Sequence, residues 1–284
     1  MRQPLSLVIV LHSREGGLAI EIYILFFIAA IVGGAINALA GGGGLITFTL
    51  LILVLPPVTA DATSAVALVA GYPTAVWRTR DELTEAVHSR WLWLLLIPSV
   101  LGGLLGALLL NWSGNRNFIV LVPWLVLGAT LLILLRPILV RQGATDDHRQ
   151  PNLAPWLWPI AVVVTFVVAL YGGYFGAGIG ILVISTLSLM RLGGIRQVVA
   201  LKNLLTGCLR GVAVVVLVVE GAVNWGYGLP MALGGLIGGY LGGMVSKRVH
   251  PKILHIVVIS IGFGVAAYYF WRLYGAGELH IGGE

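Results

Sequence analysis

Long apolar runs separated by short polar loops dominate the pattern of hydrophobic and polar positions along this chain. A helix needs about 20 mostly apolar residues to cross the hydrocarbon core of a bilayer. The apolar runs lie at residues 19–39, 45–56, 62–77, 91–110 and 118–135 in the first half, and at 156–176, 181–192, 199–219, 226–245 and 253–271 in the second. The pattern predicts an all-α integral membrane protein with about five helical segments in each half.

The second segment of each half, 45–56 and 181–192, is too short to cross a bilayer upright. It can be tilted, form half of a broken helix, or re-enter on the side it came from. Non-helical backbone at membrane depth is tolerated only where protein buries it or water reaches it. The sequence therefore leaves the number of spans between eight and ten, and leaves open whether these two segments cross.

Two glycine-rich stretches stand where a long run ends and a short run begins. The first covers residues 33–44 and the second residues 172–180. A second matched pair of glycine blocks, 102–106 and 234–238, falls in the fourth segment of each half. Matched blocks in the same order indicate an internal duplication, and a glycine-broken helix present in both halves is typical of secondary transporters.

Composition supports the membrane class and removes several alternatives. Hydrophobic residues make up 58% of the 284 residues, charged residues only 10%, and the mean hydropathy is +0.99. The single cysteine, Cys208, rules out an intramolecular disulfide, a cysteine-based zinc site and an iron–sulfur cluster. We therefore expect no metal and no cofactor, and the net charge of +6 is explained by cytoplasmic loops rather than by nucleic-acid binding.

The distribution of lysine and arginine predicts the orientation, because positive loops stay in the cytoplasm. With ten crossings, one side receives most of these residues and the other only Arg2, Arg14, Arg116 and Arg272. This asymmetry places both termini outside and gives the two repeats inverted topology. The predicted organisation of this multi-pass protein is an N-terminal extension (1–18), a first transmembrane repeat (19–140), a cytoplasmic linker (141–155) and a second transmembrane repeat (156–284).

Two cations lie inside the apolar segment 199–219. Each of Lys202 and Arg210 would cost about 2.5–3.5 kcal/mol at the centre of a membrane helix, and with Thr206 they form a stripe along one helical face. Asn203 lies beside the stripe. In one interpretation Lys202 snorkels to the interface and backbone carbonyls hold Arg210. In the other, an anionic substrate supplies the missing negative charge.

Polar residues also interrupt the first half. Asp61, Thr63 and Ser64 follow a Pro-Pro pair, and Asn37 precedes the glycine stretch. Thr63 and Ser64 would either cap the third helix or contact substrate, and Asn37 would either bond to another helix or to a ligand. Asp61 would either carry a proton or pair with Lys202. Amide groups of the broken helices, at Gly42, Gly43, Gly44 and Gly178, would favour an anion.

At these positions the chain resembles the sulfite exporter TauE/SafE family, also called the toluenesulfonate uptake permease family. The similar motifs are Asn37-Ala-Leu-Ala-Gly-Gly-Gly-Gly44, Pro56-Pro-Val-Thr-Ala60-Asp61-Ala-Thr63 and Ala200-Leu-Lys202-Asn203. The resemblance covers residues 19–272. It differs from the family pattern at Asp61, where asparagine is expected, and at Phe48-Thr49, where Phe-Pro is more usual.

The resemblance implies a transporter that moves sulfite, a sulfonate or a similar small sulfur-containing anion by alternating access. The residues predicted to bind it are Lys202, Asn203, Asn37, Gly42, Gly43, Gly44, Thr63, Ser64, Gly178, Thr206 and Arg210, with Asp61 as the coupling residue. An inside-negative potential favours export, whereas uptake would need a coupled ion such as a proton. The main alternative is a passive small-anion channel. An enzyme is disfavoured because no catalytic motif lies at membrane depth, and the oligomeric state, a homodimer included, stays open.

Overall fold

The structure, a computed structural model, describes residues 15–39, 41–83, 90–141, 155–190, 195–245, 259–260, 263–264 and 266–271. In these residues the secondary structure is entirely helical, so the predicted all-α membrane fold is confirmed. The helices are α2 (Glu15–Leu39), α3 (Gly43–Leu51), α4 (Pro57–Val69), α5 (Gly71–Arg78), η1 (Arg80–Leu83), α7 (Arg90–Arg141), η2 (Pro155–Leu157), α8 (Trp158–Tyr174), α9 (Ile179–Leu189), α10 (Ile195–Val219) and α11 (Trp225–Val245). Most of the predicted extension and linker lie outside the described residues.

Both predicted glycine stretches break a helix. Gly41 has φ +85° between α2 and α3, and Gly176 and Gly178 have φ +74° and +76° between α8 and α9. Glycine adopts this left-handed backbone without the steric cost that a Cβ brings. The short helix then folds back on the long one, because Gly33 of α2 lies against Thr47 of α3 and Gly172 of α8 lies against Ile179 of α9.

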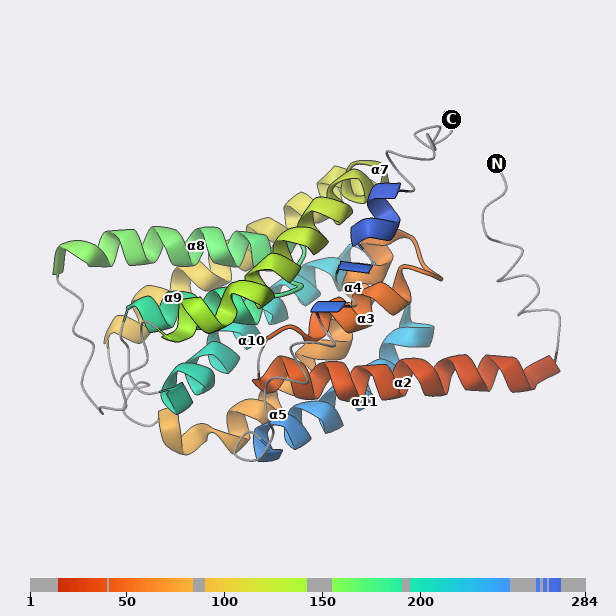
Figure 1. The fold of residues 1–284 in the computed structure, drawn as a ribbon, viewed down its shortest axis with the longest axis horizontal. Coiled ribbons are helices and arrows are strands. Elements are labelled where there is room, and N and C mark those ends of the chain that lie inside the picture. The colour runs from red at the N-terminus through yellow and green to blue at the C-terminus, as the bar shows by residue number, and fades with distance from the viewer. Residues whose placement is uncertain are drawn as a thin grey trace.

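The two broken elements approach from opposite ends of the molecule. In Figure 1, α2 runs from the right and α8 from the left, and both end near the middle of the view. Their short partners α3 and α9 turn back toward the ends from which α2 and α8 started. Each broken element therefore begins and ends toward the same end of the molecule. This path is compatible with a short segment that re-enters without crossing the bilayer.

Glycines allow the halves to pack closely on each other. Gly234 and Gly238 of α11 lie against the backbone of α2, and Gly102 and Gly106 of α7 lie against the backbone of α8. Added methyl groups at these glycines would overlap backbone atoms of the facing helix, which is the small-residue packing expected between membrane helices. The two glycine blocks found in the sequence thus make equivalent contacts, each with the first helix of the other half.

One element boundary differs from the prediction, and another agrees with it. The predicted segments 91–110 and 118–135 lie on either side of Gly114, where non-helical backbone (φ 67°, ψ 174°) divides α7 into two helical parts. Helix α4 begins at Pro57 instead of near residue 62, because proline suits the first helical position, where its missing N–H is not needed. Thr63 and Ser64 therefore lie inside α4, and the interpretation that they cap this helix is wrong.

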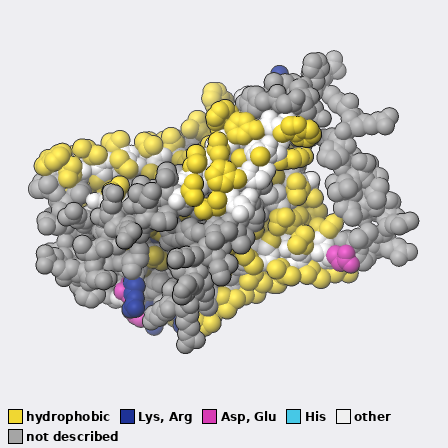
Figure 2. Space-filling model, in the orientation of Figure 1, with side chains coloured by type: hydrophobic (Ala, Val, Ile, Leu, Met, Phe, Trp, Pro, Cys, Tyr) yellow, Lys and Arg dark blue, Asp and Glu magenta, His cyan; other side chains and the backbone are white. Residues whose placement is uncertain are grey.

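The outer surface is apolar. Figure 2 shows hydrophobic side chains over much of the visible described surface, with charged side chains gathered toward the two ends. Exposed tryptophans include Trp77, Trp112, Trp156 and Trp271, as expected for anchors at the interfaces. Three described helical stretches are long and apolar enough to cross a membrane by length and composition, Ile20–Leu39, Trp91–Leu131 and Arg196–Val219.

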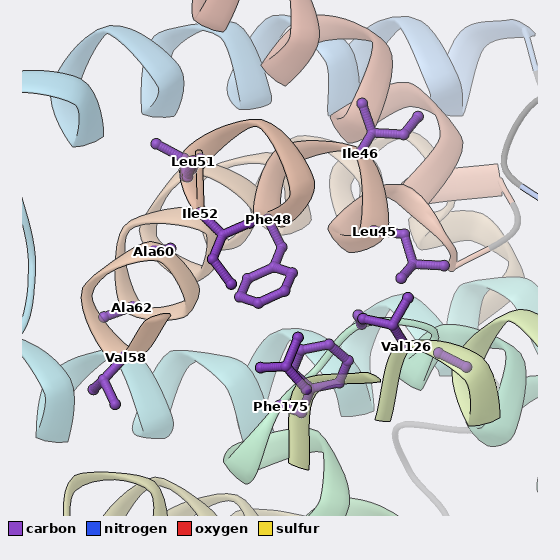
Figure 3. Packing of buried hydrophobic residues seen from close by; sticks show 14 of the residues in the cluster. Leu45, Ile46, Phe48, Leu51, Ile52, Val58, Ala60, Ala62, Val126 and Phe175 are labelled. Carbon is purple, nitrogen blue, oxygen red and sulfur yellow. The ribbon is translucent and has the colours of Figure 1, made fainter. Parts of the chain in front are cut away.

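An aromatic core joins the two broken elements. Phe48 of α3 and Phe175, which follows α8, point toward each other with ring centroids 5.1 Å apart and an edge-to-face angle of 86° (Figure 3). Phe118 of α7 contacts both rings, at 6.4 and 6.0 Å. These rings are buried, so side-chain packing holds the two broken elements against each other.

Candidate functional site

The two helix breaks touch in the interior of the protein. A Cβ built on Gly41 would overlap the backbone of Gly180, and the reverse also holds. A Cβ on Gly44 would lie 3.3 Å from Cα of Ala177. Gly42 and Gly178 are the N-cap residues of α3 and α9, so the positive ends of the two half-helices meet where the breaks cross.

Lys202 connects α10 to the break of the first half. Its side chain is 0% exposed, and Nζ donates hydrogen bonds to the carbonyl oxygens of Asn37 (2.7 Å) and Ala38 (3.0 Å) and to Oδ1 of Asn203 (2.6 Å). The carbonyls lie in the last turn of α2, where a helix carries partial negative charge. An ammonium group has three N–H donors, and these three acceptors match them. The interpretation that Lys202 snorkels to the interface is therefore wrong.

Arg210 connects the same helix to the break of the second half. Nη1 donates a hydrogen bond of 2.7 Å to the carbonyl of Gly172, near the end of α8. The guanidinium also lies directly against Gly176, because a Cβ on this glycine would overlap it. This bond agrees with the interpretation in which backbone carbonyls hold Arg210, here through the carbonyl of Gly172. The two cations on α10 thus reach different breaks, one in each half of the chain.

Asp61 faces Arg210 from the first half. It lies in the second turn of α4, and Oδ2 is 3.8 Å from Nη2 of Arg210. Asp61 is 2% exposed and Arg210 5%. Among the described residues, Oδ2 of Asp61 finds no hydrogen-bond partner, and neither does the buried hydroxyl of Thr206, one turn before Arg210. Most buried polar atoms are hydrogen-bonded, so this network is incomplete.

The predicted hydroxyl residues of α4 are buried but bond elsewhere. The hydroxyls of Ser64 and Thr47 share a hydrogen bond of 2.6 Å, which joins α4 to α3. Thr63 Oγ1 accepts a hydrogen bond of 3.1 Å from the amide of Asn224, just before α11. These bonds fix the position of α4 beside the breaks.

Several residues at this junction could not be identified as site residues from the sequence. The acceptors of the two cations include main-chain carbonyls of Asn37, Ala38 and Gly172, and a carbonyl is present at every position, so it leaves no sequence signal. The sequence did single out Asn37, but for its side-chain amide. Gly176 could have been found, because it belongs to the glycine stretch that predicts the second break.

Comparisons with known proteins agree on one family. The family model described as Sulfite exporter TauE/SafE matches residues 25–269. The chain is 28% identical over 256 residues to the probable membrane transporter protein ORF9 of Sinorhizobium sp, with 87% of this chain and 93% of the relative covered. It is also 28% identical to a probable membrane transporter protein of Haemophilus influenzae (88% and 95% covered) and 25% identical to the probable membrane transporter protein YfcA of Escherichia coli (90% and 92% covered). No solved structure matches the chain with significance.

Proposed function

The chain belongs to the sulfite exporter TauE/SafE family and is a membrane transporter, and from that premise we propose that it is a secondary transporter that exports a small sulfur-containing anion. The substrate class comes from the description of the family. Sulfite and small organic sulfonates are the candidates, since each carries several oxygens around one sulfur. The relatives named above come from bacteria, and we place the protein in the bacterial cytoplasmic membrane.

One observation carries the proposal. Lys202 and Arg210 are buried on one face of α10, and each bonds to the backbone of a different helix break. Ionised side chains inside a membrane protein are costly and usually mark a substrate or ion pathway. The N-terminal ends of α3 and α9 add amide groups beside the same junction, where they favour negative charge. Positive potential from both halves therefore converges on one place.

Alternating access fits the arrangement of the helices. The broken elements run in opposite directions in Figure 1, and the glycine blocks of α7 and α11 make equivalent contacts with α8 and α2. Both features support a pair of inverted repeats whose breaks meet near the bilayer midplane, the plan of many secondary transporters. The predicted binding residues on α4 and α10, Thr63, Ser64, Lys202, Asn203, Thr206 and Arg210, are buried in this structure. We infer that this is a state in which the site is closed to both sides.

Membrane potential would favour the proposed direction. Moving one negative charge outward across an inside-negative membrane releases about 2.3 kcal/mol per 100 mV. Export would therefore need no coupled ion, whereas uptake would. Asp61 would be the group that carries a proton in that case, because it is an acidic residue buried beside Arg210.

Thermal unfolding in detergent with a panel of sulfite, sulfate, taurine and sulfoacetate tests the proposal. A ligand that binds only the native state raises the unfolding temperature, by about 2.7 kcal/mol of stability at 100 times its Kd. We expect a sulfur anion to raise the unfolding temperature of wild type and of Arg116→Ala, an exposed arginine away from the junction. The rise should vanish in Lys202→Ala and Arg210→Gln, each compared with its own ligand-free sample. If none of the four anions stabilises wild type, the proposed substrate class is wrong.

A further inference from the structure

Asp61 lies beside the guanidinium of Arg210, with Oδ2 3.8 Å from Nη2. We infer that the Asp61 carboxylate is an internal competitor, which neutralises Arg210 in the closed state and must leave it when the transported oxyanion binds. This inference rests on the proposed function and assigns different roles to its two cations. Arg210 is the residue that binds the anion, and Lys202 positions α10 against the end of α2.

The hydrogen bonds of Lys202 support this division. Its three N–H donors point to three protein acceptors, two of them carbonyls in the last turn of α2. An anion at Lys202 would have to displace acceptors that already match the capacity of the ammonium. It would also approach the negative end of a helix, which repels it. Lys202 is thus suited to fastening α10 to the first break.

Arg210 retains capacity for a ligand. A guanidinium carries five N–H donors in a planar fork, and in the part of the chain that the structure describes it forms one hydrogen bond, from Nη1 to Gly172. Its ion pair with Asp61 is loose, because Oδ2 is 3.8 Å from Nη2, whereas paired guanidinium and carboxylate groups usually approach to about 2.7–2.9 Å. A sulfite or sulfonate group could accept two parallel hydrogen bonds from this fork, as a carboxylate does.

Thr206 supplies a second donor on the same face. It precedes Arg210 by one helical turn, so the two side chains are neighbours on α10. Its hydroxyl is buried and unpartnered among the described residues, as is Oδ2 of Asp61. One oxyanion could accept hydrogen bonds from both Arg210 and Thr206, and would thereby give the Thr206 hydroxyl and the remaining guanidinium N–H groups an acceptor.

Charge balance makes Asp61 and the substrate alternatives. With Asp61 ionised, the buried pair with Arg210 is neutral. An added anion would place two negative groups on one guanidinium, and like charges at short range in a medium of low dielectric constant repel strongly. Since Asp61 lies on α4 and Arg210 on α10, exchange of one anion for the other loosens a contact between the two halves. Binding is thereby linked to opening.

Sulfite affinity in full-length variants tests this inference, with Glu220→Gln as the matched control. Glu220 is an exposed carboxylate just beyond the end of α10, so its replacement removes the same charge away from the junction. We expect Asp61→Asn to bind sulfite at least tenfold more tightly than wild type, while Glu220→Gln stays within twofold. A gain in affinity is not the result of a damaged fold. Arg210→Gln should lose binding, and Arg210→Lys should recover only part of it, because lysine lacks the planar fork.

Thr206→Val provides an independent arm if Asp61→Asn does not fold. Its hydroxyl has no described partner, so its removal should leave stability unchanged while it weakens sulfite binding severalfold. If wild type binds sulfite but Asp61→Asn binds it no more tightly, the inference is wrong and the proposed function stands. The same conclusion follows if Asp61→Asn cannot be prepared and Thr206→Val binds sulfite as tightly as wild type does. If wild type binds none of the sulfur anions in the panel, the proposed function itself fails.

Discussion

Gly41→Ala adds one methyl group at the point where the two helix breaks touch. Gly41 has φ +85°, and a non-glycine residue in this left-handed region costs about 1–2 kcal/mol. The new methyl would also overlap the backbone of Gly180, and forced overpacking typically costs about 1–3 kcal/mol. The two effects together predict that Gly41→Ala lowers the free energy of unfolding by about 2–5 kcal/mol.

Three other glycines separate these two contributions. Gly180→Ala has the overlap without a positive φ, and Gly114→Ala has a positive φ of 67° with nothing within 4 Å of its added methyl. We expect losses of about 1–3 kcal/mol for the first, from overpacking. We also expect about 1–3 kcal/mol for the second, because essentially only glycine adopts its backbone conformation (φ 67°, ψ 174°). Gly211→Ala, inside α10 with open space around the added methyl, should stabilise by about 0.5–1 kcal/mol because alanine is the better helix former.

Unfolding midpoints of the four variants in one detergent, followed by tryptophan fluorescence, measure this series. The expected order of stability is Gly211→Ala, wild type, Gly114→Ala and then Gly41→Ala, with Gly180→Ala also below wild type. If Gly41→Ala is no less stable than Gly114→Ala, and Gly180→Ala equals wild type, the two breaks do not touch and the described junction is wrong.

Three further predictions concern the core, a helix start and coupling. Phe48→Ala should lose about 3–5 kcal/mol of unfolding free energy, since its buried ring packs between Phe175 and Phe118; a loss below 1 kcal/mol in a denaturation series would contradict this packing. Asn115→Ala should cost about 0.5–2 kcal/mol, because Asn115 Oδ1 accepts the Val58 amide at the start of α4 at 3.0 Å, and unchanged stability would show that the bond contributes nothing. Asp61→Asn should remove the pH dependence of anion uptake into proteoliposomes, because uptake is the direction that needs a coupled proton, and an unaltered pH profile would argue against proton coupling through Asp61.

Much of the fold could be predicted because it depends on local chemistry. Long apolar runs specify membrane helices, and the glycine stretches mark the breaks because a left-handed backbone favours a residue without a Cβ. Gly41, Gly176 and Gly178 have this geometry. The apolar run by itself predicts that the third helix begins near residue 62, whereas α4 begins at Pro57. Proline at a first helical position is itself a start signal.

The partners within the candidate site could be predicted only in part. The stripe of Lys202, Thr206 and Arg210 follows from helical spacing, and all three are buried as the pattern indicates. Their partners depend on how distant segments pack. The contact of Arg210 with Asp61 joins residues in different halves of the chain, and the acceptors of Lys202 include main-chain carbonyls. Neither has a signature in a single sequence.

Counterflow of labelled sulfite in proteoliposomes tests alternating access most directly. A carrier that exposes its site to one side at a time returns faster when it is loaded, so unlabelled sulfite inside the vesicles should accelerate entry of the label severalfold. Arg116→Ala should behave like wild type, and Arg210→Gln should show no such acceleration. Entry at the same rate with or without internal sulfite, accompanied by discrete single-channel currents, would instead identify a passive anion channel and contradict the account.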